Sequence, residues 1–590
     1  TKTLQQQLVE KDLPFLHEVM DGSFRYAVAY GSQNFVCLRR LQRAYQYSLP
    51  ASVEEVAQLT MIREWARETK TGLRMELEFE PSKAVWSMVS RDSDLCIGTQ
   101  CPHYSQCPYQ RARREQLDAH ILVVNHHLFF ANIATDGNLL PTYDAVIFDE
   151  AHNLEEVACS YLADEFSNTK LDYFLNQLMG RRGDRGLLLA YEERYPELVE
   201  RARMAIEDAH RAAEFLFREV QERMGDQSIF RLRERGFISN VIRDPLAQLS
   251  GVLKELSEKL SNGAERAELE AMRSRADEMN ALLQNILDIA IPGFVYWIEA
   301  EALRREPRIA LCMAPIDLAD LLSESVFING MPIVLTSATL TTAGSFDFLR
   351  ERLGIRDAVE LVVESPFQFD EQALVYIAHD LPDPALNLKH FTEQAVERVI
   401  DILRITGGAT FVLFTSYPAL RYARQRLSEA LPKMTLFVQG EMPRGKMLDE
   451  FKVTENAVLL GTNTFWQGVD VPGEALIAVI IVKLPFAVPD HPIVEARIER
   501  LREEGKDPFR YYQLPQAIIW LRQGFGRLVR TKEDYGIVAI LDPRILTRGY
   551  GQQFLRSLPR CRFTQSLDEV RKFLEDHNND ARHKSAFDVC

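Results

Sequence analysis

The stretch "AVIFDEAHN" (residues 145–153) decides the fold class of this 590-residue chain. Its apolar run ends abruptly at Asp149, Glu150 and His152, so it predicts a buried β-strand that delivers two carboxylates to its own C-terminal edge. In α/β sheets that edge holds the ligand, and nucleotide-hydrolysing proteins place magnesium and a water molecule there. An Asp-Glu pair alone can also be a helix N-cap, so the interpretation depends on the motifs further along the chain.

Six further apolar runs have the length of a buried strand: residues 120–125, 332–339, 409–416, 456–462, 476–486 and 536–542. They alternate with helical stretches, a pattern typical of a parallel sheet covered by helices on both faces. Four of the seven runs lie after residue 405 and three precede residue 340. The sequence therefore predicts two α/β domains.

Composition narrows the class of protein. A hydrophobic content of 46% allows several cores, and the net charge of -16 argues against a uniformly basic nucleic-acid-binding coat, although a basic channel can lie inside an acidic protein. No apolar segment reaches the roughly 18 to 20 residues that span a bilayer, and no signal peptide opens the chain, so we expect a cytoplasmic location and no membrane partner.

The region from about 165 to 290 has a helical pattern and is predicted to be an all-α insertion. Its leucines recur at spacings of three and four residues, which favours a packing stripe over a surface that recruits another protein. The series comprises Leu246, Leu249, Leu253, Leu256 and Leu260. The polar tail after residue 575 is expected to fray.

Three motifs lie after the insertion. "LTSATL" (335–340) is a second strand that ends in small hydroxyl residues, suited to relaying the state of a phosphate site. "GTNTFWQGVDVPG" (461–473) is a strand followed by a glycine-punctuated loop. "QGFGRLVR" (523–530) places Arg527 and Arg530 three residues apart on one helical face, where both can reach one anion.

The order DEAH, S-A-T, G-x-D-x-P-G and Q-x-x-G-R-x-x-R resembles a superfamily 2 helicase. The phrases "VKLPFAVPDHP" (482–492), "GFGRLVRTKEDYG" (524–536) and "ILDPRI" (540–545) look specifically like the bacterial DinG branch of the XPD-like iron-sulfur helicases. The resemblance covers nearly the whole chain.

The resemblance implies an α/β fold of two RecA-like parallel-sheet motor domains, the first interrupted by an iron-sulfur domain and an all-α arch domain. The implied parts are the start of motor domain 1 (1–36), the cluster domain (37–107), motor domain 1 with the DEAH box (108–162), the helical arch (163–300), the return of motor domain 1 with the SAT motif (301–364), motor domain 2 (365–575) and a polar tail (576–590). The cluster and arch domains are expected to form a gate through which one DNA strand passes.

Four cysteines are candidate metal ligands. Cys96, Cys101 and Cys107 are separated by four and five residues, and Cys37 lies upstream. Four thiolates hold either a [4Fe-4S] cluster or a structural zinc, and spacing alone does not distinguish them. The family holds a cubane cluster at the matching positions, so the resemblance implies [4Fe-4S]. The remaining cysteines (Cys159, Cys312, Cys561 and Cys590) and His103 are interpreted as structural residues or bystanders.

The resemblance also assigns roles at the DEAH box. Asp149 would bind Mg²⁺ directly or through a water, and Glu150 would orient and deprotonate the attacking water. His152 would link hydrolysis to the motifs that move DNA. Arg527 and Arg530 would meet the γ-phosphate of ATP, with Gln523 as their positioning partner.

The glycine-punctuated loop is assigned in the same way. Gly468 and Asp470 belong to the part that senses nucleotide while touching DNA, and Thr462 is a candidate DNA contact at its start. At Gln467 family members often carry Glu, so hydrogen bonding there should differ.

Arginines flank the cluster cysteines and could hold DNA phosphates without regard to sequence. They are Arg39, Arg40, Arg43, Arg111, Arg113 and Arg114. Taken singly, such arginines are more often solvated surface residues.

The phosphate-cradling sequence G-x-x-x-x-G-K-[ST] does not occur in these residues. The two Gly-Lys pairs, Gly445-Lys446 and Gly505-Lys506, lack the upstream glycine and the following Ser or Thr. In the family this loop lies just before the segment resembling "TKTLQQQLVEKDLP", so we expect that the chain begins right after it, is a fragment, and is itself nearly inactive as an ATPase.

The functional hypothesis is an ATP-dependent 5′-to-3′ DNA helicase that translocates on single strands and acts in repair or replication conflicts, on forked DNA and R-loops. Two alternatives stay open: a relative without a phosphate loop that binds single strands or forks without moving, and an XPD-type repair helicase.

Overall fold

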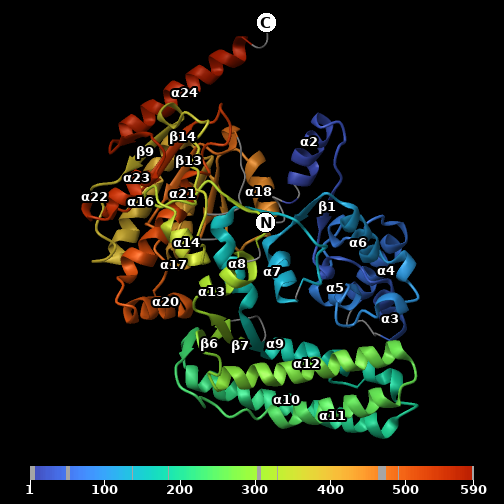
Figure 1. Cartoon of the computed structure of the whole chain (residues 1–590). Helices are drawn as coiled ribbons and strands as arrows, with labels where there is room; N and C mark the ends of the chain where they lie inside the picture. The colour runs from blue at the N-terminus through green and yellow to red at the C-terminus, as the bar shows by residue number, and fades with distance from the viewer. Residues whose placement is uncertain are drawn as a thin grey trace. The chain divides into compact units, whose positions relative to one another are not determined.

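The computed structural model describes residues 5, 7–47, 53–135, 137–183, 185–301, 307–327, 330–462, 465, 473–489 and 491–587 (Figure 1). Contacts divide the chain into two units. The first comprises Thr1–Ala145, Leu154–Leu318 and His491–Ala496, and the second comprises Val146–Asn153, Ala319–Asp490 and Arg497–Cys590. Each unit is described by itself.

A seven-stranded parallel sheet organises the second unit. Its order is β11 (Thr435–Val438), β12 (Ala457–Gly461), β10 (Thr410–Leu413), β13 (Ala478–Ile481), β14 (Gly536–Ile540), β9 (Ala373–Ile377) and β15 (Arg562–Thr564). All four strands predicted after residue 405 lie in this sheet, which confirms the predicted parallel α/β motor fold there.

Helices cover both faces of this sheet (Figure 1). Successive residues of a strand point to opposite faces, so Val479 packs against one cluster and Ile480 against the other. One face is covered by α18 (Arg444–Val453), α21 (Leu514–Phe525) and α23 (Gly551–Ser557), and the other by α16 (Leu388–Thr406), α17 (Tyr417–Ala430) and α24 (Leu567–Phe587). Burial on both faces explains why these strands are uninterrupted apolar runs.

A second parallel pair in this unit carries the DEAH and SAT motifs. β3 (Val146–Asp149) pairs with β8 (Ile333–Thr336), with Asp149 opposite Thr336. Both strands are confirmed. Within the pair Phe148 is buried, whereas Ile147 is 72% exposed and its cross-strand partner Val334 is 52% exposed.

The first unit holds another parallel pair, β1 (Tyr26–Ala29) with β2 (Ile121–Val124). Between these strands in the sequence lie three α-helices of the predicted cluster domain, α3 (Leu38–Tyr47), α4 (Val53–Glu68) and α5 (Lys83–Val89), which share a small apolar core. Helix α6 (Pro108–Asp118) follows them, in the range predicted for motor domain 1.

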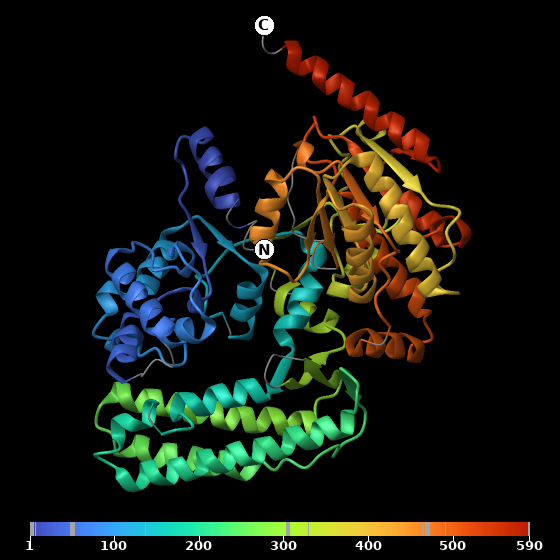
Figure 2. The ribbon, with the colours of Figure 1, turned by 180° about the vertical axis from the view of Figure 1, so that it is seen from behind.

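The predicted insertion is mainly helical but not all-α. Helices α9 (Asn168–Leu178), α10 (Pro196–Met224), α11 (Arg243–Lys259) and α12 (Gly263–Leu287) lie side by side (Figure 2). An antiparallel sheet adjoins them, in the order β4 (Asp164–Ser167), β7 (Arg308–Pro315), β6 (Phe294–Glu301) and β5 (Ile229–Leu232). β4 and β5 are only four residues long, too short to interrupt the helical pattern of the sequence.

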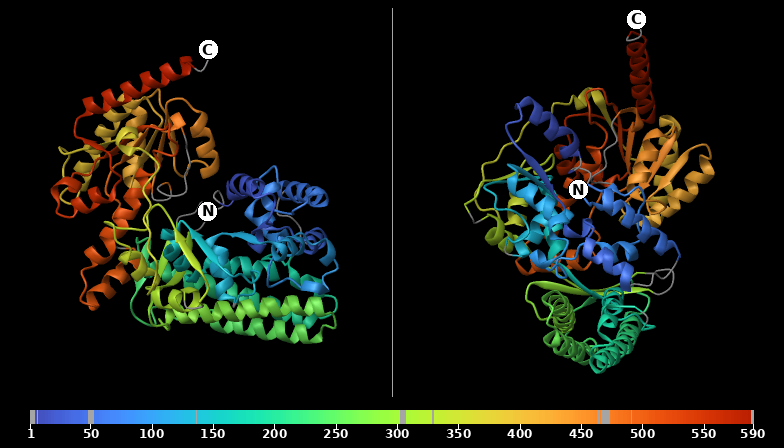
Figure 3. Two further views of the ribbon diagram at one scale, coloured as in Figure 1. Left: turned by 45° about the horizontal axis from the view of Figure 1, so that its top comes forward. Right: turned by 90° about the vertical axis from the view of Figure 1, so that its right-hand side faces the viewer.

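The leucine series of the insertion lies entirely in its core, which confirms the packing stripe. The tail that was expected to fray continues α24 as far as Phe587 (Figure 3). None of the helices in the described residues combines the length and apolarity needed to cross a bilayer. The seven predicted domain ranges stay predictions.

We expect Gly536→Ala to destabilise the seven-stranded sheet. A Cβ at this first residue of β14 would lie 2.2 Å from the Ile477 carbonyl oxygen and 2.8 Å from Leu528 Cδ1, and ladder bonds hold the backbone on both sides. Overpacking of this kind costs roughly 1 to 3 kcal/mol or more. Urea unfolding followed by circular dichroism should show a clearly lower midpoint.

Gly445→Ala in α18 is the matched control, because a Cβ there meets no atom within 4 Å. Its midpoint should be unchanged or slightly higher. Equal midpoints for the two variants would contradict the described packing of β14.

Candidate active site

The DEAH residues leave the end of β3 in a strained conformation. Asp149 is the last residue of the strand, and its Oδ1 accepts a hydrogen bond from the Glu150 backbone N–H at 2.9 Å. Glu150 has a φ of 51°, a left-handed value that side-chain-bearing residues rarely adopt. Strain of this kind typically persists where surrounding contacts hold a functional side chain in place.

One hydroxyl joins the DEAH box to the SAT motif. Ser337 Oγ donates to Glu150 Oε2 at 3.1 Å and lies 2.7 Å from His152 Nδ1. It also accepts from the Thr339 backbone N–H at 3.2 Å. Because a hydroxyl has one proton and the carboxylate takes it, His152 Nδ1 must carry its own proton and donate to Ser337. The serine thus uses its single proton and both acceptor positions.

His152 is held neutral in this network. Burial and the charge of Arg527 lower the pKa of His152 to about 4, although Asp149 acts in the opposite direction. Its side chain is only 6% exposed. The effect of Arg527 indicates that this arginine lies close to the DEAH histidine, so two motifs far apart in sequence come together. Helix α21 (Leu514–Phe525) ends before both arginines, so the prediction that Arg527 and Arg530 share one helical face is wrong: they follow the helix in turn and loop residues.

A residue just before the predicted arginine motif also contacts the SAT loop. Arg522 donates from Nη1 to the Thr341 carbonyl at 2.8 Å and from Nη2 to the Ala338 carbonyl at 2.9 Å. Burial lowers the pKa of this guanidinium. Arg522 thus fixes helix α21 to the loop that follows β8.

For Gln523 and Arg530, the other two predicted residues of the arginine motif, the structure shows burial and backbone contacts. The Gln523 side chain is 6% exposed, and neither its Oε1 nor its Nε2 has a hydrogen-bond partner in the described part of the chain. The Arg530 backbone N–H donates to buried Asp534 at 2.7 Å. Asp534 also accepts from the Gly473 N–H at 3.1 Å, which ties the end of the arginine motif to the end of the glycine-punctuated loop.

The start of that loop is fixed by Gln439. Its Oε1 accepts from the Thr462 N–H at 2.6 Å and from Thr462 Oγ1 at 3.0 Å, while its Nε2 donates to Tyr417 at 2.8 Å. Thr462 is only 6% exposed. The other predicted residues of this loop, Gln467, Gly468 and Asp470, lie outside the described residues.

The four candidate metal ligands line one cavity. Cys37, Cys96, Cys101 and Cys107 share it with the side chains of Leu95 and Ile97 and with several arginines. In the described residues no three His, Cys, Asp or Glu side chains converge on a point that would hold a single metal ion. Burial raises the pKa of the Cys37 thiol, although the Arg40 backbone N–H and the charges of Arg40 and Arg39 act the other way. Four thiols around one partly apolar cavity are a donor set that fits an iron-sulfur cluster.

The predicted DNA-binding arginines fall into two groups. Arg39 donates to the Leu95 carbonyl, Arg40 to the Ser87 and Ser90 carbonyls, and Arg113 to the Leu139 carbonyl, at 2.6 to 2.7 Å. Arg111 and Arg114 are exposed on helix α6.

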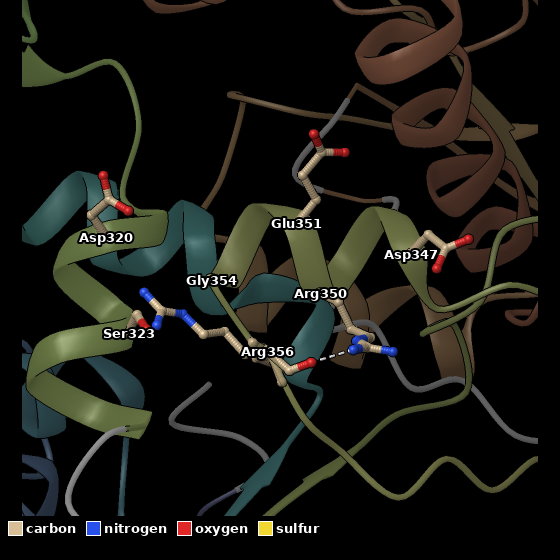
Figure 4. A pocket seen from close by; sticks show the side chains of 8 residues that line it. Asp320, Ser323, Asp347, Arg350, Glu351, Gly354 and Arg356 are labelled. Atoms are coloured by element: carbon tan, nitrogen blue, oxygen red, sulfur yellow. Dashed lines mark hydrogen bonds between the residues drawn. The ribbon is translucent and has the colours of Figure 1, made fainter.

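A separate polar pocket of about 420 Å³ in the second unit holds none of the predicted residues (Figure 4). Arg350 and Arg356 line it together with Asp320, Asp347 and Glu351. Arg350 donates to the Arg356 carbonyl and binds Glu360, and Glu351 pairs with Lys506, so much of its charge is balanced locally.

Sequence interpretation missed Arg522, Asp534 and Gln439. Arg522 directly precedes the quoted motif "QGFGRLVR", and Asp534 lies within the quoted phrase "GFGRLVRTKEDYG". For Arg522, a charged residue at the end of the apolar run "AIIWL" was a signal that sequence interpretation could have used. Gln439 comes directly after the short strand β11, and nothing in its sequence context marks it.

Comparison with known proteins first defines the class. The family described as "Helicase C-terminal domain" matches residues 399–561, and DEAD_2 matches residues 84–171. A solved structure titled "XPD_Helicase" shares the fold with a TM-score of 0.57 at 13% identity, over 93% of this chain and 89% of that chain. With the DEAH, SAT and arginine motifs assembled, the chain is a helicase-class protein with a RecA-like parallel sheet.

Relatives then define the family. "ATP-dependent DNA helicase YoaA" of Haemophilus influenzae is 32% identical over 98% of this chain and 88% of its own length. "ATP-dependent helicase DinG" of Mycobacterium tuberculosis is 30% identical over 97% of this chain and 86% of its own length. The chain belongs to the DinG/YoaA family of ATP-dependent helicases.

The His152 network predicts a pH-dependent stability. Because the folded-state pKa of about 4 is below the ordinary 6.5, the unfolded chain binds the proton more strongly, and stability is lost as the pH falls from 6.5 towards 4. At pH 5 the loss is about 2 kcal/mol. His152→Asn should therefore show a smaller drop in Tm between pH 7.5 and pH 5 than the wild type.

Exposed His379→Asn is the control and should keep the wild-type drop. An undiminished drop in His152→Asn would mean that His152 is not held neutral.

Proposed function

We propose that this member of the DinG/YoaA family is an ATP-dependent DNA helicase that translocates 5′-to-3′ on a single strand and acts at forks and R-loops in repair or replication conflicts. The observation that carries the proposal is the Glu150–Ser337–His152 network beside Arg527. The direction of movement and the DNA structures rest on the resemblance to the DinG branch.

The network suits a hydrolytic motor. Asp149 would hold Mg²⁺, which when bound neutralises phosphate charge, and Glu150 would take the proton of the attacking water. A carboxylate that turns towards water gives up its bond to Ser337. Ser337 and His152 then rearrange, so the state of Glu150 reaches the loop that Arg522 ties to helix α21.

The arginines that follow α21 would supply positive charge to that site. Arg527 and Arg530 would stabilise the γ-phosphate as its charge develops, a contribution of roughly 10³ to 10⁵ in rate for comparable arginines. Gln523, buried with its amide unpartnered among the described residues, is the group that positions them.

We further propose that Cys37, Cys96, Cys101 and Cys107 hold a [4Fe-4S] cluster. The proposal is supported by the four cysteines lining one cavity and by the resemblance, because four thiolates are the donor set of such a cluster. The cluster's task here is to hold separate chain segments together.

For DNA we propose contacts at Arg111 and Arg114, because they are exposed, whereas Arg39, Arg40 and Arg113 donate to backbone carbonyls. Thr462, Gly468 and Asp470 remain proposed contacts of the second motor domain.

A non-motor DNA-binding role is the second candidate, favoured by the absence of G-x-x-x-x-G-K-[ST] from the 590 residues. An XPD-type repair role has less support, because similarity to XPD at 13% identity shows the fold alone.

We expect this 590-residue chain to bind ATP weakly and to hydrolyse almost none, because backbone N–H groups and a lysine that neutralise the phosphates are missing from its sequence. Phosphate release with single-stranded DNA present measures this. Glu150→Gln is the control for turnover at the DEAH box. A turnover near 10 s⁻¹, ordinary for enzymes, that Glu150→Gln abolishes would contradict the expectation.

We expect the double variant Arg111→Ala/Arg114→Ala to bind single-stranded DNA more weakly and with less salt dependence. Each lost phosphate contact reduces the slope of log K against log salt by about 0.7, so the pair should reduce it by about 1.4. Fluorescence anisotropy over a salt series measures the slope.

Arg201→Ala is the control, because this exposed arginine of the insertion pairs with Glu255. If the double variant keeps the wild-type slope, Arg111 and Arg114 do not contact DNA phosphates.

A further inference from the structure

Helix α12 presents two opposite charges to the segments that bear the cluster cysteines. Glu268 and Arg275 lie seven residues apart, which is two helical turns, so they share one face. Both pair with residues that come from the cysteine-bearing region of the same unit.

Glu268 contacts the segment that comes after Cys37. Arg43 of α3 hydrogen-bonds to it, and Arg39 Nη1 lies 3.7 Å from its Oε2. The Glu268 side chain is 8% exposed and that of Arg39 is 13% exposed. α3 begins directly after Cys37, so this buried pair fixes the first cysteine-bearing segment on α12.

Arg275 contacts the segment that precedes Cys96. Its Nη2 donates to both Asp92 oxygens at 2.7 and 2.8 Å and to Asp94 Oδ2 at 2.7 Å. Leu95, 4% exposed, packs into the hydrophobic core of the helical insertion. The residue next to a cluster cysteine is therefore part of the core that α12 helps to build.

Arg39 joins the two cysteine-bearing segments directly. Besides meeting Glu268, it donates from Nη2 to the Leu95 carbonyl at 2.6 Å. Cys37 and Cys96, 59 positions apart in sequence, are thus held by one arginine and by one face of one helix.

We propose that this charge clasp, formed by Arg39, Arg43, Asp92, Asp94, Glu268 and Arg275, couples the docking of helix α12 to the retention of metal in the cysteine cavity. The inference rests on the proposed cluster. A metal group that spans Cys37 and Cys96 fixes the spacing of the two segments that α12 grips, and α12 fixes the spacing that the metal group needs. Such coupling is reciprocal by thermodynamic necessity, so weakening either partner weakens the other.

The chemistry of the pairs makes the clasp sensitive to loss of one partner. Removing one member of an ion pair leaves an uncompensated charge, and the cost rises with burial; Asp92 is 18% exposed, whereas Asp94 is 55% exposed and contributes less. Arg275→Ala leaves Asp92 and Asp94 side by side without their cation, next to Cys96.

The test uses the full chain, purified anaerobically with its metal. EDTA in excess is added, and iron and zinc that remain with the protein are counted over time by elemental analysis. Arg275→Ala should lose metal several-fold faster than the wild type, because part of a coupled loss of affinity, ordinarily about 5- to 150-fold, falls on the release rate. Asp92→Asn keeps the shape of the side chain and removes one charge, so it should accelerate metal loss by a smaller factor. It replaces Arg275→Ala as the test variant if Arg275→Ala folds poorly.

Arg273→Ala is the matched control, because its ion pairs, with Glu270 and Asp277, stay within α12. It should lose metal at the wild-type rate. The charge exchange Arg275→Glu with Asp92→Arg should recover much of the loss caused by Arg275→Glu alone.

The reverse direction has its own readout. Hydrogen exchange of the α12 amides near residues 268–275 should accelerate in Cys96→Ser relative to the wild type, while the α10 amides change less. Metal that is present but leaves Arg275→Ala at the wild-type rate would overturn the clasp alone. A chain that binds neither iron nor zinc would overturn the metal site and the clasp together.

Discussion

The hydroxyl of Ser337 is the contact on which the candidate active site depends. It meets Glu150 and His152 because β3 and β8 pair in a register that sets Asp149 opposite Thr336. The next residue of each motif, Glu150 and Ser337, is thereby brought within hydrogen-bonding distance. A shift of that register by one residue would turn alternate side chains to the other face and dissolve the network. The positive φ of Glu150 is the local cost of bringing its carboxylate back towards the serine.

Short polar contacts also connect the SAT loop that carries Ser337 to helix α21. Arg522 binds the loop carbonyls after β8, and Arg527 lies close enough to help keep His152 neutral. Asp534 then ties the end of the arginine motif to Gly473.

The sequence predicted seven of the parallel strands in the described residues because strands buried on both faces are continuous apolar runs, as in 409–416 and 536–542. It did not predict the parallel strands β1, β9, β11 and β15. It missed β4 and β5 because four residues such as "DEFS" carry too little periodicity to interrupt a helical pattern. The sequence also pointed to the DEAH, SAT and arginine motifs, which the structure brings close together within the second unit; their roles at a phosphate stay a proposal. It could not tell Arg39 from Arg111: one guanidinium donates to a carbonyl and the other is exposed, a difference made by tertiary contacts from residues far away in sequence.

The account depends most on the four cysteines acting as one metal-binding unit, because they would connect the DNA-binding segment, the helical insertion and the family assignment. The direct measurement is the visible absorption spectrum of anaerobically purified protein, with iron, sulfide and zinc counted per chain. The account predicts a brown sample with a broad visible band and about four irons and four sulfides per chain, as a [4Fe-4S] cluster requires. A colourless sample that carries one zinc ion would contradict it.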